Sequence, residues 1–323
     1  MRRAMIIMIV LLFESIFGFS IAQLQVGFYK NACPNAESIV AGVVKDAAKV
    51  NPQIPAIMLR LHFHDCFVEG CDGSILIDGQ NSEQHAFGHQ GVQGYEVIEI
   101  AKTNLESVCP GVVSCADIVA MAARDGVALR SGPGYEVETG RKDGLVSNIN
   151  LADRMPDVKD SIQLLKQKFI EQGLNEKDLV VLSAAHTIGT TACFFMEDRL
   201  YNSAQGGGPD PSINPEFLPE LTQTCPKNGD VNRRLPMDHG SGDTFDNQIL
   251  QNVRSGFAVL ESDAKLMDDP TTKGIVDSYF GVLNPLIGPS FEEDFVNSMV
   301  RMGRIGTKTS SNGNIRRACK AFN

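Results

Sequence analysis

The sequence lacks an excess of basic residues and, after its N-terminal region, any long hydrophobic run. Its 29 lysines and arginines are outnumbered by 39 aspartates and glutamates, which gives a formal charge of −10. Such a chain is a poor candidate for binding nucleic acid or an anionic membrane surface, because both attract basic patches. No later stretch reaches the roughly 20 apolar residues that a membrane-spanning helix needs. We therefore expect neither nucleic acid nor a membrane as a partner.

Internal repeats, low-complexity linkers and the strict alternation typical of strands are also scarce or missing. Helical spacing of apolar residues is common instead, and it predicts a mostly α-helical protein. A chain of about 300 residues can form one domain or two. The stretches expected to be helical are 36–50, 54–61, 95–108, 114–129, 160–172, 179–186, 246–253, 273–283 and 291–302.

The first 22 residues have the pattern of a secretory signal peptide. Arg2 and Arg3 precede an apolar run over 5–13, and small residues stand at the cleavage position. Glu14 interrupts the apolar run, which argues against a membrane anchor. We therefore expect residues 1–22 to be removed and the mature chain to be exported.

Eight cysteines are present, an even number. In an exported protein such a set predicts four disulfides, which leaves no thiol for catalysis. Cys66 and Cys71 flank a short Phe-Val-Glu-Gly segment and have no nearer partners, so the sequence suggests this one pair. The partners of the other cysteines stay open at this point.

The densest group of reactive side chains lies in 60–72. The apolar run 54–61 before it predicts a buried helix whose end presents these groups. Arg60 and His64 are four residues apart, so they share a face of that helix. A histidine beside an arginine is favoured in its neutral form and can act as a base. The pair suits the removal of a proton from a bound acid and the stabilisation of the departing anion.

The other histidines of these stretches carry less information alone. His62 points to another side of the predicted helix and is interpreted as structural. A zinc hydrolase site built on His62 and His64 is the alternative, but no third ligand lies at helical spacing and Arg60 would repel a cation. His186 ends the predicted apolar helix 179–186 and lies in the stretch 182–189, which is rich in small residues. A single histidine in that setting is usually structural as well.

Together, the stretches 60–66 and 182–189 resemble the two histidine motifs of the class III secretory plant peroxidases, which are haem enzymes. The similarity covers the mature chain and includes all eight cysteines. It implies a mostly α-helical haem peroxidase fold, a single domain over 23–323, with haem b between distal and proximal halves. The implied disulfides are Cys33 with Cys109, Cys66 with Cys71, Cys115 with Cys319, and Cys193 with Cys225.

The resemblance also implies a reaction and the residues that perform it. The enzyme would reduce hydrogen peroxide to water and oxidise phenolic or other small aromatic donors in one-electron steps. His64 would be the distal acid–base group, Arg60 would stabilise the developing negative charge, and Phe63 belongs to the same motif. His186 would bind the haem iron, while Asp263 would accept its other imidazole proton. The positions that match the exposed haem edge, where donors bind, are Phe87, Pro156 and Phe195.

Two calcium sites are implied as well, because hard cations bind carboxylate, hydroxyl and carbonyl oxygens. The first set comprises Asp65, Val68, Gly70, Asp72 and Ser74, and the second comprises Thr187, Asp238, Ser241, Thr244 and Asp246. In the loop of the second set, Gly242 stands where the family usually has proline, which predicts a more flexible loop and weaker calcium binding.

One departure from the family pattern concerns the distal site. His89 stands where the family usually has an asparagine that accepts a hydrogen bond from the distal histidine. We expect neutral His89 to accept the proton of His64, and activity to fall as His89 protonates in mildly acidic medium. If His89 impaired the distal site, the alternative would be a catalytically weak, calcium-stabilised extracellular haem-binding protein.

Asp117 and Arg141 match a buried salt bridge that joins the two halves in the family, so we expect a structural role for them.

The expected setting follows from the signal peptide and the resemblance. We expect a secreted monomer of the apoplast or cell wall, with hydrogen peroxide and phenolic donors as its small-molecule partners. Its acidic charge would weaken attachment to pectate, which predicts a soluble or loosely held wall protein.

Overall fold

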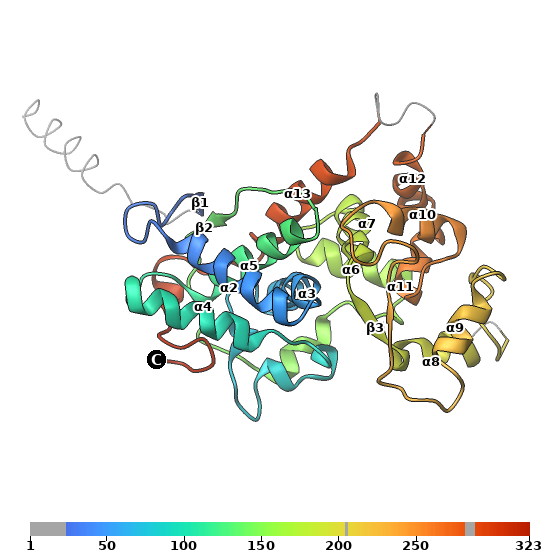
Figure 1. Cartoon of the computed structure of the whole chain (residues 1–323), viewed down its shortest axis with the longest axis horizontal. Helices are drawn as coiled ribbons and strands as arrows, with labels where there is room; N and C mark the ends of the chain where they lie inside the picture. The colour runs from blue at the N-terminus through green and yellow to red at the C-terminus, as the bar shows by residue number, and fades with distance from the viewer. Residues whose placement is uncertain (1–23, 204–205, 282–287) are drawn as a thin grey trace, which may run out of the picture.

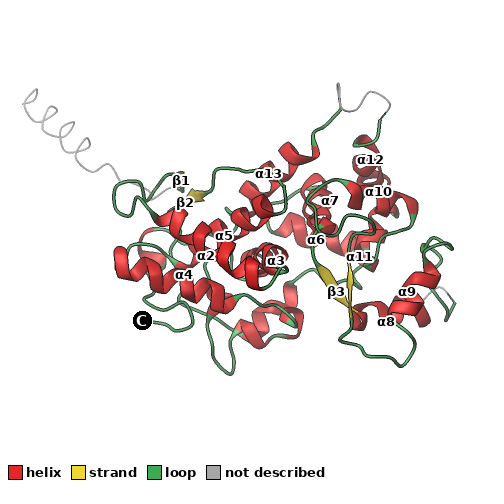
Figure 2. Ribbon diagram, viewed as in Figure 1, coloured by secondary structure: helices red, strands yellow, loops and turns green. Residues whose placement is uncertain are grey.

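The computed structural model describes residues 24–203, 206–281 and 288–323, and within them the chain is mostly α-helical (Figures 1 and 2). The expected signal peptide lies outside the described residues. The α-helices are α2 (Ala36–Val50), α3 (Ile54–Cys66), α4 (Tyr95–Val108), α5 (Cys115–Leu129), α6 (Ile162–Glu171), α7 (Glu176–Ser183), α8 (Glu197–Tyr201), α9 (Leu218–Thr224), α10 (Gln248–Ser255), α11 (Glu261–Ala264), α12 (Pro270–Ser278) and α13 (Phe291–Met302). None of the helices in the described ranges is long and apolar enough to cross a membrane.

Short 3-10 helices and two small sheets connect these elements. Strand β1 (Gln25–Val26) pairs antiparallel with β2 (Glu138–Thr139), and β3 (Thr190–Ala192) pairs antiparallel with β4 (Arg234–Pro236). The 3-10 helices are η1 (Ser74–Leu76), η2 (Glu83–His85), η3 (Phe87–His89), η4 (Ile149–Arg154), η5 (Ala184–Thr187), η6 (Cys193–Met196), η7 (Lys265–Met267) and η8 (Ser310–Asn312).

Capping side chains explain where several helices differ from their predicted bounds. Asp269 accepts hydrogen bonds from two backbone N–H groups of the first turn, so α12 begins at Pro270, before the predicted start. Its predicted end at position 283 lies outside the described residues. Helix α6 begins only after Ser161, whose side chain accepts from the backbone of Leu164. The side chain of Asn35, in contrast, makes no capping hydrogen bond to α2.

The helix that leads to His186 ends earlier than the sequence predicts. Asn175 and Asp178 form a reciprocal capping box, so α7 starts at Glu176. The helix ends at Ser183, and the chain tightens into the 3-10 helix η5, which contains His186. This histidine therefore belongs to a tight turn rather than to the apolar helix before it.

Helix α3 lies between two hydrophobic cores and contributes to both (Figure 1). Met58 and Leu61 pack with buried residues of α2, α4 and α5. Leu59 and Cys66 pack with a second core made chiefly by α6, α7, α10, α12 and α13. Because two different sides of α3 are buried in different cores, its remaining face is fixed between the two halves. That face carries Arg60.

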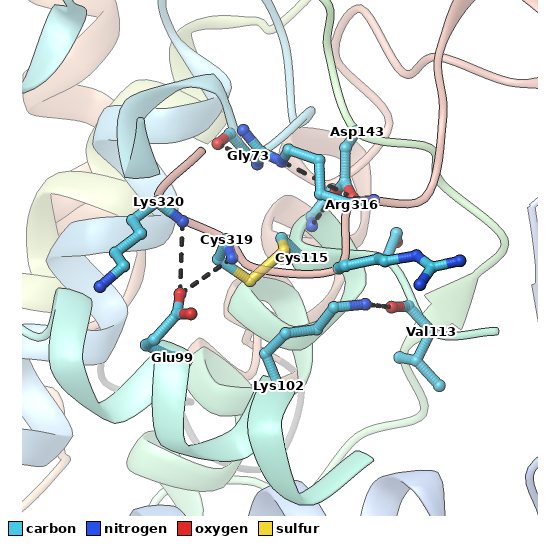
Figure 3. The surroundings of a disulfide bond; sticks show 12 residues. Gly73, Glu99, Lys102, Val113, Cys115, Asp143, Arg316, Cys319 and Lys320 are labelled. Atoms are coloured by element: carbon cyan, nitrogen blue, oxygen red, sulfur yellow. Dashed lines mark hydrogen bonds and ion pairs between the residues drawn. A yellow bond between two sulfur atoms is a disulfide. The ribbon is translucent and has the colours of Figure 1, made fainter. Parts of the chain in front are cut away.

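Four disulfides join Cys33 with Cys109, Cys66 with Cys71, Cys115 with Cys319, and Cys193 with Cys225, the same pairs that the resemblance implies. The bond from Cys115 to Cys319 fastens the C-terminal segment to α5 (Figure 3). Beside it, Glu99 Oε2 accepts a hydrogen bond from the backbone N–H of Cys319 at 2.8 Å. Arg316 donates to the carbonyl of Gly73 in the loop after α3. The C-terminal segment thus holds this loop in place.

Candidate active site and metal sites

The distal group is formed by Arg60 and His64, one turn apart on α3. Arg60 Nε donates to His64 Nε2 at 3.1 Å, and Arg60 Nη2 donates to the carbonyl of Gln90 at 3.1 Å. Because Nε2 accepts, the imidazole of His64 is neutral and carries its proton on Nδ1. Burial lowers the pKa of His64 well below its usual value, and the charge of Arg60 lowers it further. Both observations agree with the neutral base that the sequence predicts.

His89 lies directly against His64. The two rings make a T-shaped contact with their centroids 5.1 Å apart. His89 Nδ1 donates to the carbonyl of Glu83 at 2.8 Å, which leaves Nε2 as an acceptor. Neither His89 Nε2 nor His64 Nδ1 has a hydrogen-bond partner among the described residues, although both are buried. The donor His64 Nδ1 and the acceptor His89 Nε2 are therefore both unpaired, and they belong to neighbouring rings.

The environment of His89 moves its protonation to lower pH than the sequence suggests. Burial, together with the positive charge of Arg60, lowers the pKa of His89 to about 4. The expectation that His89 protonates in mildly acidic medium is therefore wrong, and protonation occurs at lower pH. The sequence does not reveal that the ring is buried beside a guanidinium. His89 is neutral through the mildly acidic range.

Phe63 completes the distal side. Its ring makes T-shaped contact with His64, with centroids 5.3 Å apart, and a tilted contact with Phe67 at 4.5 Å. The side chain is only partly buried, unlike Phe67, which belongs to the core. Phe63 is therefore an apolar wall beside the histidine.

The proximal group pairs His186 of η5 with Asp263 of α11. His186 Nδ1 lies 3.1 Å from each carboxylate oxygen of Asp263 and donates to that group, so its Nε2 is free to bind a metal. The side chain of Asp263 is 2% exposed, whereas that of His186 is 35% exposed, so the imidazole borders an open space. Burial alone would lower the pKa of His186, but the Asp263 carboxylate raises it. The positive charge of Arg60 makes a smaller contribution, which lowers this pKa.

The first predicted calcium set contains two buried carboxylates, those of Asp65 and Asp72. Asp65 Oδ2 accepts from the backbone of Gly73 at 3.0 Å, while Asp65 Oδ1 has no partner in the described part of the chain. Asp72 Oδ1 accepts from the backbone of Ser74 at 3.0 Å. Burial raises the pKa of both aspartates, and for Asp65 the nearby Asp72 adds to the rise. Such a cluster fits a divalent cation, which would supply the missing positive charge.

The structure also brings the side chains of the second calcium set together, beside the proximal histidine. Thr187 Oγ1 donates to Asp238 Oδ2 at 2.9 Å. Ser241 Oγ lies 3.0 Å from Asp238 Oδ2 and 3.1 Å from Asp246 Oδ1. The carbonyl of Thr244 is 3.4 Å from Thr187 Oγ1. Burial raises the pKa of Asp238 to about 6, and these oxygens also fit a hard cation.

Two residues near these sets were not predicted from the sequence. Glu83 is fully buried. Its Oε2 accepts from Ser74 Oγ at 3.1 Å, and its Oε1 has no partner within the residues that the structure describes. Burial, with the charge of Asp72, raises the pKa of Glu83 to about 8. Asn252 of α10 donates to Asp238 Oδ1 and to the carbonyl of His239. A single polar residue in a loop or helix has no spacing pattern that could have marked either.

The residues predicted at the donor-binding edge form a less defined group. Phe87 is 68% exposed, and Phe195 makes a T-shaped contact with Phe194 at 5.2 Å. Pro156 is partly buried. Their exposure agrees with a rim position, but no ring contact in the described residues joins Phe87 to Phe195.

His62 belongs to the core of α3. Its Nδ1 lies 3.5 Å from Cys66 Sγ, and burial lowers its pKa to about 3. Because Cys66 is bonded to Cys71, neither sulfur is a thiolate that could bind a metal. The arrangement supports the structural interpretation and gives a zinc site no ligand set.

The geometry therefore pairs a neutral base and a guanidinium with a carboxylate-bound histidine, in a mostly helical fold with four disulfides. Residues 40–281 match the family described as Peroxidase. The chain is 64% identical to Peroxidase 43 of Arabidopsis thaliana over 308 residues, covering 95% of this chain and 94% of the relative. It is 54% identical to Peroxidase 13 of the same plant over 319 residues, covering 98% of each. It is 49% identical to Peroxidase N1 of Nicotiana tabacum over 299 residues, covering 93% of this chain and 90% of the relative.

These matches and the fold define a haem peroxidase. The chain belongs to the peroxidase family, in its class III plant branch. It is an oxidoreductase whose substrates are hydrogen peroxide and a reducing donor.

Proposed function

We propose that His64 and Arg60 activate hydrogen peroxide and that His186 and Asp263 hold the haem. When bound, haem supplies the iron and the electrons for cleavage of the O–O bond. His64 Nε2 takes the proton of the bound peroxide and returns it to the leaving oxygen, so that water departs. Arg60 donates hydrogen bonds to the negative charge that develops on that oxygen. The neutral state of His64 is the observation that carries this assignment, because a protonated imidazole could not act as the base.

On the proximal side, His186 Nε2 would bind the haem iron. Asp263 holds the Nδ1 proton of the ring, which fixes its orientation and makes Nε2 more electron-donating. The free Nε2 and the open space beside the imidazole support this role. Phe63 keeps the distal side apolar, and Phe87, Pro156 and Phe195 form the rim where a small phenolic donor would approach.

The test is stopped-flow haem absorption of the mature chain, loaded with haem and calcium, after addition of hydrogen peroxide. We expect a rapid spectral change that guaiacol then reverses. A normal resting haem spectrum with slow, feeble conversion would contradict the assignment of His64 and Arg60. It would favour the alternative of a catalytically weak haem-binding protein on the same fold.

We propose that His89 takes the hydrogen bond of His64 Nδ1, the place usually held by asparagine. Above its pKa of about 4, neutral His89 can accept through Nε2; below it, the ring is protonated and cannot. Replacing His89 by asparagine should therefore remove part of the acid-side loss of peroxide activation, since an amide oxygen accepts at every pH. The measurement is the activation rate of both proteins from about pH 3 to about pH 7.

The matched control for this prediction is His85→Asn, which changes an exposed histidine of the neighbouring 3-10 helix. It should leave the pH profile as it is. Identical profiles for the native protein and His89→Asn would refute the role of His89.

Two calcium ions are proposed at the two oxygen-rich sets beside α3 and η5. Removing calcium with a chelator should leave the buried carboxylates uncompensated and lower the free energy of unfolding. The loss should be about 3 kcal/mol per site for a site held at a hundredfold excess over Kd. Thermal unfolding with calcium and with EDTA measures the total.

Variants separate the two calcium sites. Asp72→Asn should remove the part of the EDTA-induced stability loss that comes from the first set. Asp238→Asn should remove the part that comes from the second set. We expect the second loss to be smaller, because Gly242 leaves that loop more flexible than proline would. Unfolding curves that do not respond to EDTA would rule out both sites.

We further propose that residues 23–323 form a single domain, secreted as a monomer to the apoplast or cell wall. The four disulfides support an oxidising compartment, and the acidic composition supports loose attachment to pectate. Low-salt extraction of wall material should release the protein. Retention until high salt would argue against loose attachment.

A further inference from the structure

Two guanidinium groups, those of Arg60 and Arg234, lie near the space between the distal and proximal sides, and neither forms an ion pair within the described residues. Arg60 comes from α3, and Arg234 begins β4. Burial, with a contribution from the positive charge of Arg234, lowers the pKa of Arg60 to about 10, so Arg60 remains a cation at neutral pH. Like charges near one another repel, and an anion bound to Arg234 would relieve the repulsion.

Backbone packing places Arg234 close to this space. Gly189 lies so near Ala56 of α3 that an added Cβ would come within 2.6 Å of the Ala56 side chain. Ala56 is one helical turn before Arg60 and shares its face. Thr190, the next residue after Gly189, begins β3, and His186 is only four residues before it. The start of β3 thus lies beside both Arg60 and the candidate iron ligand.

Hydrogen bonds fix the guanidinium of Arg234 at this point. Its Nε donates to Thr190 Oγ1 at 2.7 Å, and its Nη2 donates to the carbonyl of Thr190. An arginine has five N–H donors, so the remaining ones can bind a further acceptor. The residue is exposed, which puts it at the rim of the space rather than in its interior. An oriented guanidinium at a rim is suited to a carboxylate, which it can bind through two parallel hydrogen bonds.

We propose that Arg234 binds a propionate carboxylate of haem. The inference rests on the proposed function, because it requires haem between His64 and His186. Haem b carries its two propionate carboxylates on one edge of the ring, and a cation on the rim would suit such a group. Arg234 is thus a haem-binding residue on the proximal strand, distinct from Arg60, which faces the peroxide.

The test measures haem release rather than activity. The calcium-loaded holoprotein is mixed with excess apomyoglobin, and transfer of haem is followed by its visible absorption. Arg234→Gln should release haem about tenfold to a hundredfold faster, since hydrogen bonds to a charged group are of that order. Thr190→Val, which removes the oxygen that orients Arg234 Nε, should give a smaller increase.

Two controls isolate the carboxylate. Arg233→Gln changes an exposed arginine directly before β4 and should release haem at the native rate. Haem dimethyl ester lacks both carboxylates, so the native protein and Arg234→Gln should release it equally fast. Equal release of unmodified haem by Arg234→Gln and the native protein would overturn the inference. So would a variant that speeds release of the ester as much as that of haem, because that would indicate general damage to the site.

The proposed function has a separate readout in the same experiment. If the native protein binds no haem at all, the proposed function fails and the inference fails with it. If the native protein binds haem and Arg234→Gln retains it equally well, only the role of Arg234 is wrong.

Discussion

Replacing His64 by leucine should slow the reaction of the haem-loaded enzyme with hydrogen peroxide by about 10²- to 10⁴-fold, the usual contribution of a general acid–base group. Leucine cannot take the peroxide proton, and it also removes the acceptor of Arg60 Nε. The proposed iron ligand is His186 rather than His64, so haem binding should be retained. Stopped-flow absorption after peroxide addition, at several peroxide concentrations, gives the rate constant.

The matched control is His85→Leu, which makes the same substitution at an exposed histidine outside the site. It should react at the native rate. If His64→Leu also reacted within a few-fold of the native rate, the proton would be moved by another group, and the assignment of the distal base would be wrong.

Replacing Asp117 by asparagine should lower the free energy of unfolding by about 3–5 kcal/mol, the usual cost of breaking a buried ion pair from one side. The Asp117 carboxylate accepts from Arg141 Nη1 at 2.8 Å, from the backbone of Gly140 at 2.7 Å and from the hydroxyl of Tyr29 at 2.6 Å. Arg141 would remain buried, with only carbonyl oxygens such as that of Gly303 as acceptors. Urea unfolding of the calcium-loaded protein measures the difference.

Asp46→Asn is the control for this change, because Asp46 forms an exposed ion pair with Lys49 on α2. Exposed pairs contribute little, so its urea midpoint should match that of the native protein. A midpoint for Asp117→Asn equal to that of Asp46→Asn would mean that the buried pair does not hold the two halves together.

Much of the helical framework could be predicted because helix formation depends on neighbours three or four residues apart. The bounds of α2, α4 and α13 agree with the predicted stretches, and Arg60 and His64 share a face of α3 as their spacing requires. The motifs and the even cysteine count carried the resemblance, and the family comparisons confirm it. Errors fell at helix ends, such as that of α7, where a tight 3-10 turn competes with the α-helix.

The sequence by itself determined the helical class, the peroxidase family and the identity of the candidate catalytic residues, because these depend on local spacing and on motifs. Tertiary structure decided the environment of His89, the burial of Glu83 and the place of Arg234 beside the site. Each of these depends on segments far apart in the chain. Arg234, for example, is hydrogen-bonded to Thr190, which lies 44 positions earlier. Burial and charge act through space, so folding must bring such segments together before a pKa shifts or a binding rim exists.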